Sequence, residues 1–159
     1  SGISVLYLFY VYNYISKASS NVMNRELMLI PLFAQVLLTL FVGTIARLRR
    51  DRAVKDGFNW RYFKTFEGEK PPRYVLQADQ HLVNLFESPL FFFVAGILAI
   101  SLNTVDQLIL FMAILYVFLR CIHAHVSLTN NRLLWRARVF IISCLIILMM
   151  WLWLLYLNI

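Results

Sequence analysis

Polar residues in one long apolar stretch are the first candidates for chemistry in this chain. Four of them recur at spacings of three and four: Gln77, Gln80, Asn84 and Glu87. On a helix this spacing places all four on one face. A carboxylate at the centre of a membrane-crossing helix costs roughly 2.5–3.5 kcal/mol, so such groups persist where they face other protein segments or a wet cavity. We therefore expect a polar binding face on this helix.

Later stretches supply cationic and polar side chains that can meet this face. Two groups of them recur at spacings of three and four, as on one face of a helix: Arg120, His123 and Ser127, and then Arg132 and Arg136. Arg47 ends the first apolar stretch and is expected at the same depth in the membrane. The planar fork of arginine suits carboxylates and keeps its charge when partly buried. Together with Glu87, these residues predict a site for a small anionic ligand that carries both carboxylates and an ammonium group.

Some of these charged residues can also be explained by a purely structural role, without any ligand. Glu87 can form an interhelical salt bridge with Arg120 or Arg136 that serves only the fold. Other arginines are better explained as anchors whose side chains reach the lipid headgroups: Arg49, Arg50, Arg52 and Arg138.

No metal site is expected from the histidines and cysteines. His123 and His125 are two residues apart and point to nearly opposite sides of a helix, and His81 has no acidic or histidine partner at chelating spacing. Cys121 and Cys144 lie in separate apolar stretches with neither metal nor disulfide spacing, so we expect two buried thiols.

The elements that position these residues are membrane-crossing helices. The 159 residues are 61% hydrophobic and only 14% charged, which is too little charge for a soluble domain of this size. The apolar runs are long and continuous rather than alternating, which favours helices. The predicted fold class is all-α: an integral membrane four-helix bundle.

Breaks in the apolar pattern predict where each helix begins and ends. The four spans run from Glu26 to about Ala46, from Tyr74 to Ser101, from an N-cap at Thr104 to Leu128, and from Arg132 to Leu157. The polar and aromatic segment 51–73 is expected to lie at the membrane surface. Residues 1–22 are interpreted as an appended or peripheral apolar segment before the membrane domain, residues 23–159. A fifth span is the alternative for this segment.

The positive charge is distributed unevenly along the chain. Of 15 Lys and Arg residues, nine fall in 47–73 and four in 120–138, so most lie at one membrane face. The positive-inside rule makes this face cytoplasmic and puts both termini on the other side. The rule also accounts for the net charge of +7 without a nucleic acid partner.

Once the spans are placed, the polar motifs resemble a known family. Asn84-x-x-Glu87 in the second span, Arg120-x-x-His123 in the third, and Arg132-x-x-x-Arg136-x-x-x-Phe140 in the fourth resemble the MAPEG superfamily. These are membrane-associated proteins in eicosanoid and glutathione metabolism. The similarity covers roughly residues 23–159, is most specific over 120–140, and looks closest to a bacterial branch.

The resemblance implies four-helix protomers assembled as a homotrimer, with glutathione between neighbouring protomers near the cytosolic face. Arg47, Asn84, Glu87 and His123 match glutathione-contacting positions, and Arg136 matches the arginine that stabilises the thiolate. A guanidinium beside a thiol lowers the pKa of that thiol and raises its reactive fraction. For a bacterial member, the membrane would be the inner one.

The chain also departs from the family pattern. Gln80 and Val83 stand where glutathione-binding members have arginines, and Ser127 and Phe140 stand where the prostaglandin synthase has tyrosines. Ser127 can still donate a hydrogen bond to a thiolate.

Two functions are therefore expected. The first is a membrane-embedded glutathione or thiol transferase, or a peroxidase-like protein, that acts on lipophilic electrophiles from the bilayer. The second is a non-catalytic, lipid-binding or accessory subunit of a larger membrane complex, with the polar face serving structure.

Overall fold

The computed structural model describes the backbone of residues 2–159 and the side chains of residues 25–159. The chain is all-helical over the described residues, with five helices: α1 (Gly2–Lys55), α2 (Tyr62–Thr65), α3 (Arg73–Ser101), α4 (Gln107–Leu128) and α5 (Leu133–Asn158). Four helices in the described part are long and apolar enough to cross a membrane, the first of them over Arg25–Lys55. The predicted fold class is confirmed. The peripheral segment predicted for residues 1–22 falls outside the residues with described side chains.

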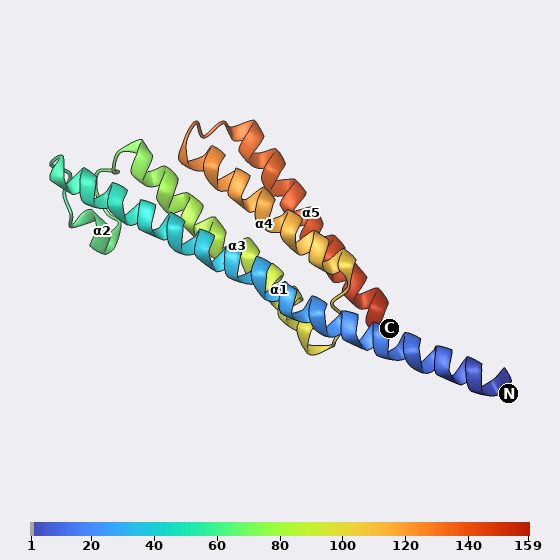
Figure 1. The fold of residues 1–159 in the computed structure, drawn as a ribbon. Helices are drawn as coiled ribbons and strands as arrows, with labels where there is room; N and C mark the ends of the chain where they lie inside the picture. The colour runs from blue at the N-terminus through green and yellow to red at the C-terminus, as the bar shows by residue number, and fades with distance from the viewer. Residues whose placement is uncertain (1) are drawn as a thin grey trace.

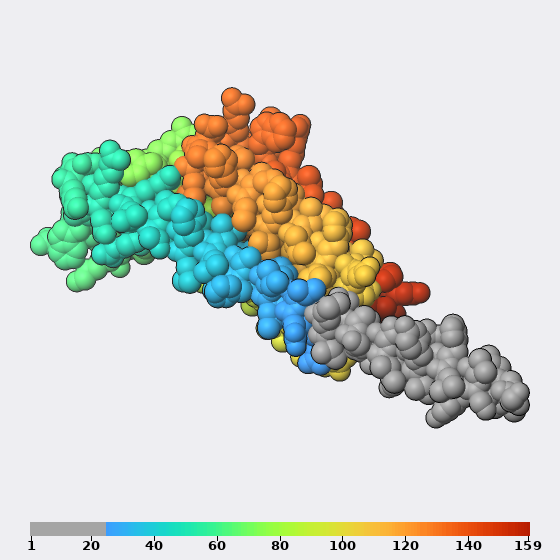
Figure 2. Space-filling model, viewed as in Figure 1, coloured from blue at the N-terminus to red at the C-terminus, as the bar shows by residue number. Residues whose placement is uncertain are grey.

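The four long helices run side by side as an elongated bundle (Figure 1). Packing is most extensive between α4 and α5 and between α1 and α3, while α4 also contacts α1 and α3. Most of the core is apolar and lies in the half away from α2, built around Phe92, Ile109, Tyr116 and Met150. The short helix α2 and the loop between α4 and α5 lie at the other end (Figures 1 and 2). The segments at this end carry most of the arginine and lysine residues of the sequence.

A glycine allows α1 and α3 to approach closely. A Cβ atom at Gly96 would lie 2.8 Å from Leu32 Cδ2 and 3.0 Å from Met28 Cε. Small residues at such contacts let membrane helices gain van der Waals packing, which replaces the hydrophobic driving force that lipid does not supply.

The start of α4 differs from the prediction. The N-cap is Asp106 rather than Thr104, and its carboxylate accepts a hydrogen bond of 2.8 Å from the Ile109 backbone N–H. Aspartate is at least as good a cap as threonine. Here it gains a second role, because Asp106 Oδ2 also accepts from Trp153 Nε1 at 2.8 Å and so ties α4 to α5.

The end of α1 also differs from the prediction. The helix continues past Ala46 to Lys55. Ion pairs at a spacing of four support this extension: Arg47 with Asp51 at 3.1 Å and Arg52 with Asp56 at 3.9 Å. Pairs at this spacing stabilise the exposed face of a helix, so a charged sequence that looked like a loop remains helical.

Two arginines predicted to anchor in headgroups bind the protein instead. Arg49 donates to the Tyr74 carbonyl oxygen at 2.9 Å and to the Leu128 carbonyl oxygen at 2.7 Å. Arg50 pairs with Asp79 at 2.9 Å. These contacts join the end of α1 to the start of α3 and the end of α4. The Leu128 carbonyl lies in the last turn of α4, where carbonyl groups lack helical partners.

Candidate functional site

Three of the predicted site residues line one polar cavity. Asn84 of α3, His123 of α4 and Arg136 of α5 surround a space of about 160 Å³, closed by Phe140 and two apolar residues of α5. The three- and four-residue spacing in the sequence predicted that each of these residues lies on the inward-facing side of its helix, as observed. The short loop between α4 and α5 brings His123 and Arg136 together, since it makes the two helices antiparallel neighbours.

Arg136 is held by the loop that precedes its helix. Its Nη1 donates to Asn131 Oδ1 at 2.8 Å. Asn131 has a positive φ of 45°, a conformation that asparagine tolerates better than most residues. This hydrogen bond fixes the direction of the guanidinium and leaves its remaining N–H groups for a ligand.

Arg120 lies entirely inside the bundle. It is 0% exposed, and its Nη2 makes one long hydrogen bond of 3.3 Å to the Asn84 carbonyl oxygen. Its guanidinium carbon lies 5.7 Å from the centroid of the Phe140 ring. Its Nε and Nη1 have no hydrogen-bond partner among the described residues. A buried cation with free donors can accommodate an anion, because an uncompensated charge in an apolar interior is costly.

His81 is a buried neighbour of the polar-cavity residue His123 that the sequence analysis did not include in the site. It is 1% exposed, and its ring centroid lies 4.9 Å from that of His123. Spacing along the chain did not reveal this neighbour, because the contact forms between two helices. His81 shares the buried face of α3 with Ala78 and Leu85, and this three- and four-residue spacing could have revealed its position.

The two histidines have free nitrogen atoms but no third ligand. Neither nitrogen of His81, nor Nδ1 of His123, has a hydrogen-bond partner in the described part of the chain. No cluster of three or more side chains able to hold a metal ion occurs among the described residues.

Glu87 does not form the expected salt bridge. It is exposed on α3, and no ion pair joins it to Arg120, to Arg136 or to any other described residue. The reason is geometric: the buried face of α3 carries His81 and Leu85, while Glu87 lies on an exposed side of the helix, at the edge of the space between α3 and α5. Gln80 is exposed as well.

The other predicted residues also lie outside the polar cavity. Arg47 is exposed, paired with Asp51, and lines a separate pocket beside Trp60 and Phe63. Arg132 is exposed at the N-cap of α5 and makes no side-chain cap hydrogen bond. Ser127 is 1% exposed and does not line the cavity. Of the predicted site residues, one protomer therefore brings only Asn84, His123 and Arg136 together in the polar cavity.

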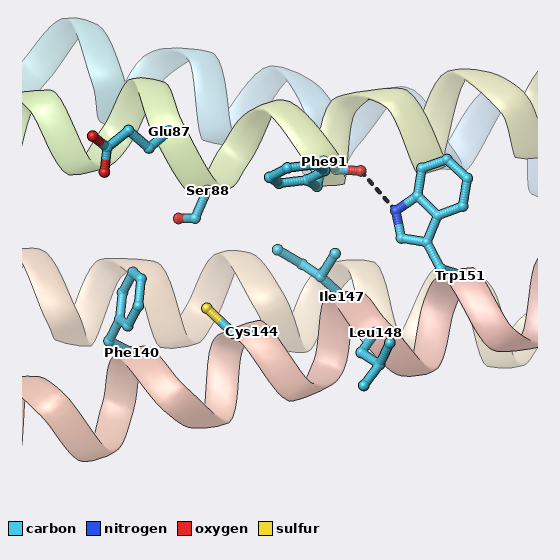
Figure 3. A pocket seen from close by; sticks show the side chains of 8 residues that line it. All are labelled: Glu87, Ser88, Phe91, Phe140, Cys144, Ile147, Leu148 and Trp151. Atoms are coloured by element: carbon cyan, nitrogen blue, oxygen red, sulfur yellow. Dashed lines mark hydrogen bonds between the residues drawn. The ribbon is translucent and has the colours of Figure 1, made fainter.

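An apolar pocket lies next to the polar cavity, between α3 and α5. It encloses about 490 Å³, and Phe140 lines both spaces. Figure 3 shows Glu87 at one end and Trp151 at the other, where Trp151 Nε1 donates to the Phe91 carbonyl oxygen at 3.3 Å. Between them the walls are aromatic and aliphatic, with Ser88 and Cys144 as the other polar groups.

The two thiols differ from the prediction that both are buried. Cys121 is exposed on the outer side of α4, and Cys144 is half-buried in the wall of the apolar pocket. Because α4 and α5 are apolar around most of their circumference, the sequence did not indicate which side of each helix faces away from the bundle.

Comparison with known proteins agrees with this arrangement of helices and motifs. No curated protein and no solved structure matches the sequence. The model of the MAPEG family matches residues 28–156, which cover nearly all of the four helices that can cross a membrane and every residue of the polar cavity. The chain therefore belongs to the MAPEG family and is an integral, multi-pass membrane protein.

Proposed function

We propose that the protein transfers a thiol, glutathione in the first instance, to lipophilic electrophiles that enter from the bilayer. The observation that carries this proposal is the contact between two unlike spaces at Phe140. A polar cavity with Asn84, His123 and Arg136 lies on one side of this ring, and an apolar pocket lies on the other. A reaction between a polar thiol and an apolar acceptor needs both. The family includes glutathione transferases.

The residues of the polar cavity fit a peptide thiol. His123 Nδ1 is buried without a described partner, and Arg136 uses one nitrogen for Asn131. When bound, glutathione would supply the nucleophilic sulfur. Arg136 would stabilise negative charge on that sulfur, since a donor already oriented toward developing charge needs no reorganisation during the reaction. Asn84 and His123 would orient polar groups of the peptide.

The proposal includes an oligomer, for which a homotrimer is the family arrangement. A cavity of about 160 Å³ is smaller than the roughly 300 Å³ at which ligand pockets begin. Glu87 lies at the midpoint of α3 and is exposed in the protomer. A carboxylate at that depth favours contact with protein or water over lipid. A neighbouring protomer at this face would shield Glu87 and Gln80 and enlarge the cavity.

The orientation in the membrane is also a proposal. The end of α1, the segment that follows it with α2, and the loop between α4 and α5 lie at one end of the bundle, and the C-terminus lies at the other (Figure 1). The positive-inside rule assigns the basic end to the cytoplasm. In a bacterium this would be the cytoplasmic side of the inner membrane, where glutathione can reach the polar cavity.

The test compares two arginines of α5. Arg136→Lys keeps one charge but loses the planar fork. It should reduce conjugation of glutathione to a chlorodinitrobenzene-type electrophile by roughly a hundredfold. The matched control is Arg138→Lys, because Arg138 is exposed and lies against Trp135. The control should retain the wild-type rate. Glutathione should also raise the melting temperature of the wild-type protein.

Two results would reject the thiol-transferase proposal. One is the absence of both turnover and a thermal shift at saturating glutathione, and the other is an equal loss of rate in the two variants. The apolar pocket would then support the second candidate, a non-catalytic lipid-binding or accessory subunit. Native mass spectrometry tests the oligomer separately, and a monomer alone across mild detergents would contradict the trimer.

A further inference from the structure

A large basic pocket lies beyond the membrane-crossing part of α1. It encloses about 700 Å³, within the roughly 300–1,000 Å³ that is usual for ligand sites. One wall is the end of α1 and the other is α2 with the loop before it, and Figure 1 shows α2 beside the last turns of α1. Four basic side chains line the pocket: Arg47, Arg50, Lys55 and Lys64. Among the described residues it shares no lining residue with the polar cavity or the apolar pocket, so it is a separate space.

The protein neutralises only part of the positive charge in this basic pocket. Asp51, the carboxylate of the described lining, already pairs with Arg47 at 3.1 Å. Lys55 and Lys64 form no ion pair with any residue whose side chain is described. The pocket can therefore accept an anion with one or two negative charges.

Aromatic rings direct two of the basic side chains. Lys64 Nζ lies 6.0 Å from the centroid of the Trp60 ring, and Arg50 Cζ lies 5.3 Å from the centroid of the Phe63 ring. Arg50 is also fixed by its ion pair with Asp79 at 2.9 Å. A cation over an aromatic ring is attracted by the ring. The charges are therefore partly ordered before a ligand arrives, which lowers the entropy cost of binding.

The basic pocket lies at the depth of the lipid headgroups. About 20 helical residues cross the hydrocarbon core, and the apolar part of α1 ends near Ala46. Arg47 and Arg50 follow in the next turn. Trp60, in the same pocket, is 56% exposed, and tryptophan is enriched at the boundary between lipid and water. Basic residues just outside a membrane helix attract anionic lipids, so the anion that a membrane supplies at this depth is a headgroup phosphate.

An apolar groove lies on the same face of α1, deeper in the membrane. It encloses about 320 Å³ between α1 and α3, with Val36 and Leu40 on the α1 side and Phe86 and Leu90 on the α3 side. Leu40 is 63% exposed and lies two helical turns before Arg47, so the two residues share a face. A basic pocket at headgroup depth, followed by an apolar groove, fits one ligand that carries both a phosphate and an acyl chain.

We propose that the basic pocket binds a phosphate ester, supplied by the headgroup of an anionic membrane lipid. Lys55 and Lys64 carry the free charges that neutralise the phosphate. One acyl chain of the lipid lies in the groove between α1 and α3.

The experiment measures lipid binding to the full-length protein in detergent by native mass spectrometry. The probes are phosphatidylglycerol and phosphatidylcholine with the same acyl chains, and phosphatidylglycerol should bind more tightly. Lys64→Gln should weaken phosphatidylglycerol binding about fivefold, which is the contribution of one basic residue near a membrane surface. The matched control is Lys70→Gln, because Lys70 is exposed on the same segment and does not line the pocket. Equal affinity for the two lipids, or equal affinities of the two variants, would overturn the proposal.

A second pair of variants changes binding in the opposite direction, which a damaged fold cannot do. Asp51→Asn removes the carboxylate from the pocket and frees Arg47, so the affinity for phosphatidylglycerol should rise severalfold. Asp56→Asn removes a carboxylate that is exposed and outside the pocket, so the affinity should not change. Unchanged or weaker lipid binding by Asp51→Asn would contradict the proposed site.

A soluble phosphate ester distinguishes two sources of the same chemical group. Glycerol phosphate carries the phosphate without acyl chains, so it should not displace phosphatidylglycerol at an equal concentration. Displacement at an equal concentration would assign the pocket to a free phosphate ester and overturn the role of the lipid. None of these measurements contains glutathione, so their outcome is independent of the transferase proposal.

Discussion

The arginines at the basic end of the bundle differ from the arginine in its interior in how they use their N–H groups. Arg49 donates to two carbonyl oxygens at 2.9 and 2.7 Å, and Arg50 pairs with Asp79 at 2.9 Å. Arg120 is more deeply buried, yet it makes one contact of 3.3 Å and has two nitrogens without described partners.

This difference separates arginines that join helices from an arginine that is available to bind an anion. Arginines that join helices have their charge and hydrogen bonds satisfied within the chain, so their removal leaves a helix-terminal carbonyl group or a carboxylate without its partner. An arginine without internal partners contributes little to the folded state and remains available for an anion. The contrast predicts opposite stability effects for the same substitution at the two places.

The largest effect is expected at Arg49. Arg49→Met removes two hydrogen bonds from a charged donor, which should lower the free energy of unfolding by about 3 kcal/mol. The control is Arg52→Met on the same helix, where the side chain is 79% exposed and its ion pair with Asp56 is long. Melting temperatures in one detergent provide the measurement. Equal melting of the two variants would mean that Arg49 does not hold the helices together.

A smaller effect is expected at Asp79. Its ion pair with Arg50 has side chains 19% and 31% exposed, between a buried pair and a surface pair. Asp79→Asn should therefore cost about 1–2 kcal/mol. The matched change Asp56→Asn, in a pair that is 66% and 79% exposed, should have almost no effect. A loss of stability of the same size in both would contradict the assignment of Arg50 to a structural role.

The sequence predicted the spans well because length and apolar character decide whether a helix crosses a membrane. It also predicted that Asn84, His123 and Arg136 meet, since each lies on a definable helix face near the same end of the bundle. Both predictions depend on local periodicity and on the family motifs.

The roles of the arginines at the end of α1 could not be predicted from local periodicity or from the family motifs. Arg49 and Arg52 are equally polar and lie three residues apart. Arg49 donates hydrogen bonds to two other helices, whereas Arg52 is exposed. The difference depends on where the Tyr74 and Leu128 carbonyl groups lie in space. The contact between His81 and His123 has the same origin, because it forms between helices and not along one of them.

The smallest stability effect is expected at Arg120, although it is the most deeply buried arginine described. Arg120→Met replaces a buried charge that has no described counter-charge with an apolar side chain of similar length, and such replacements are often neutral or stabilising. The substitution loses the long hydrogen bond to the Asn84 carbonyl oxygen and the guanidinium contact with the Phe140 ring.

The melting temperature of Arg120→Met without ligand should therefore equal or exceed that of the wild type, while Arg49→Met melts well below it. A fall in melting temperature as large as that of Arg49→Met would mean that the Arg120 charge is already compensated inside the bundle. The guanidinium would then not be free to bind an anion, and the distinction between the two groups of arginines would fail.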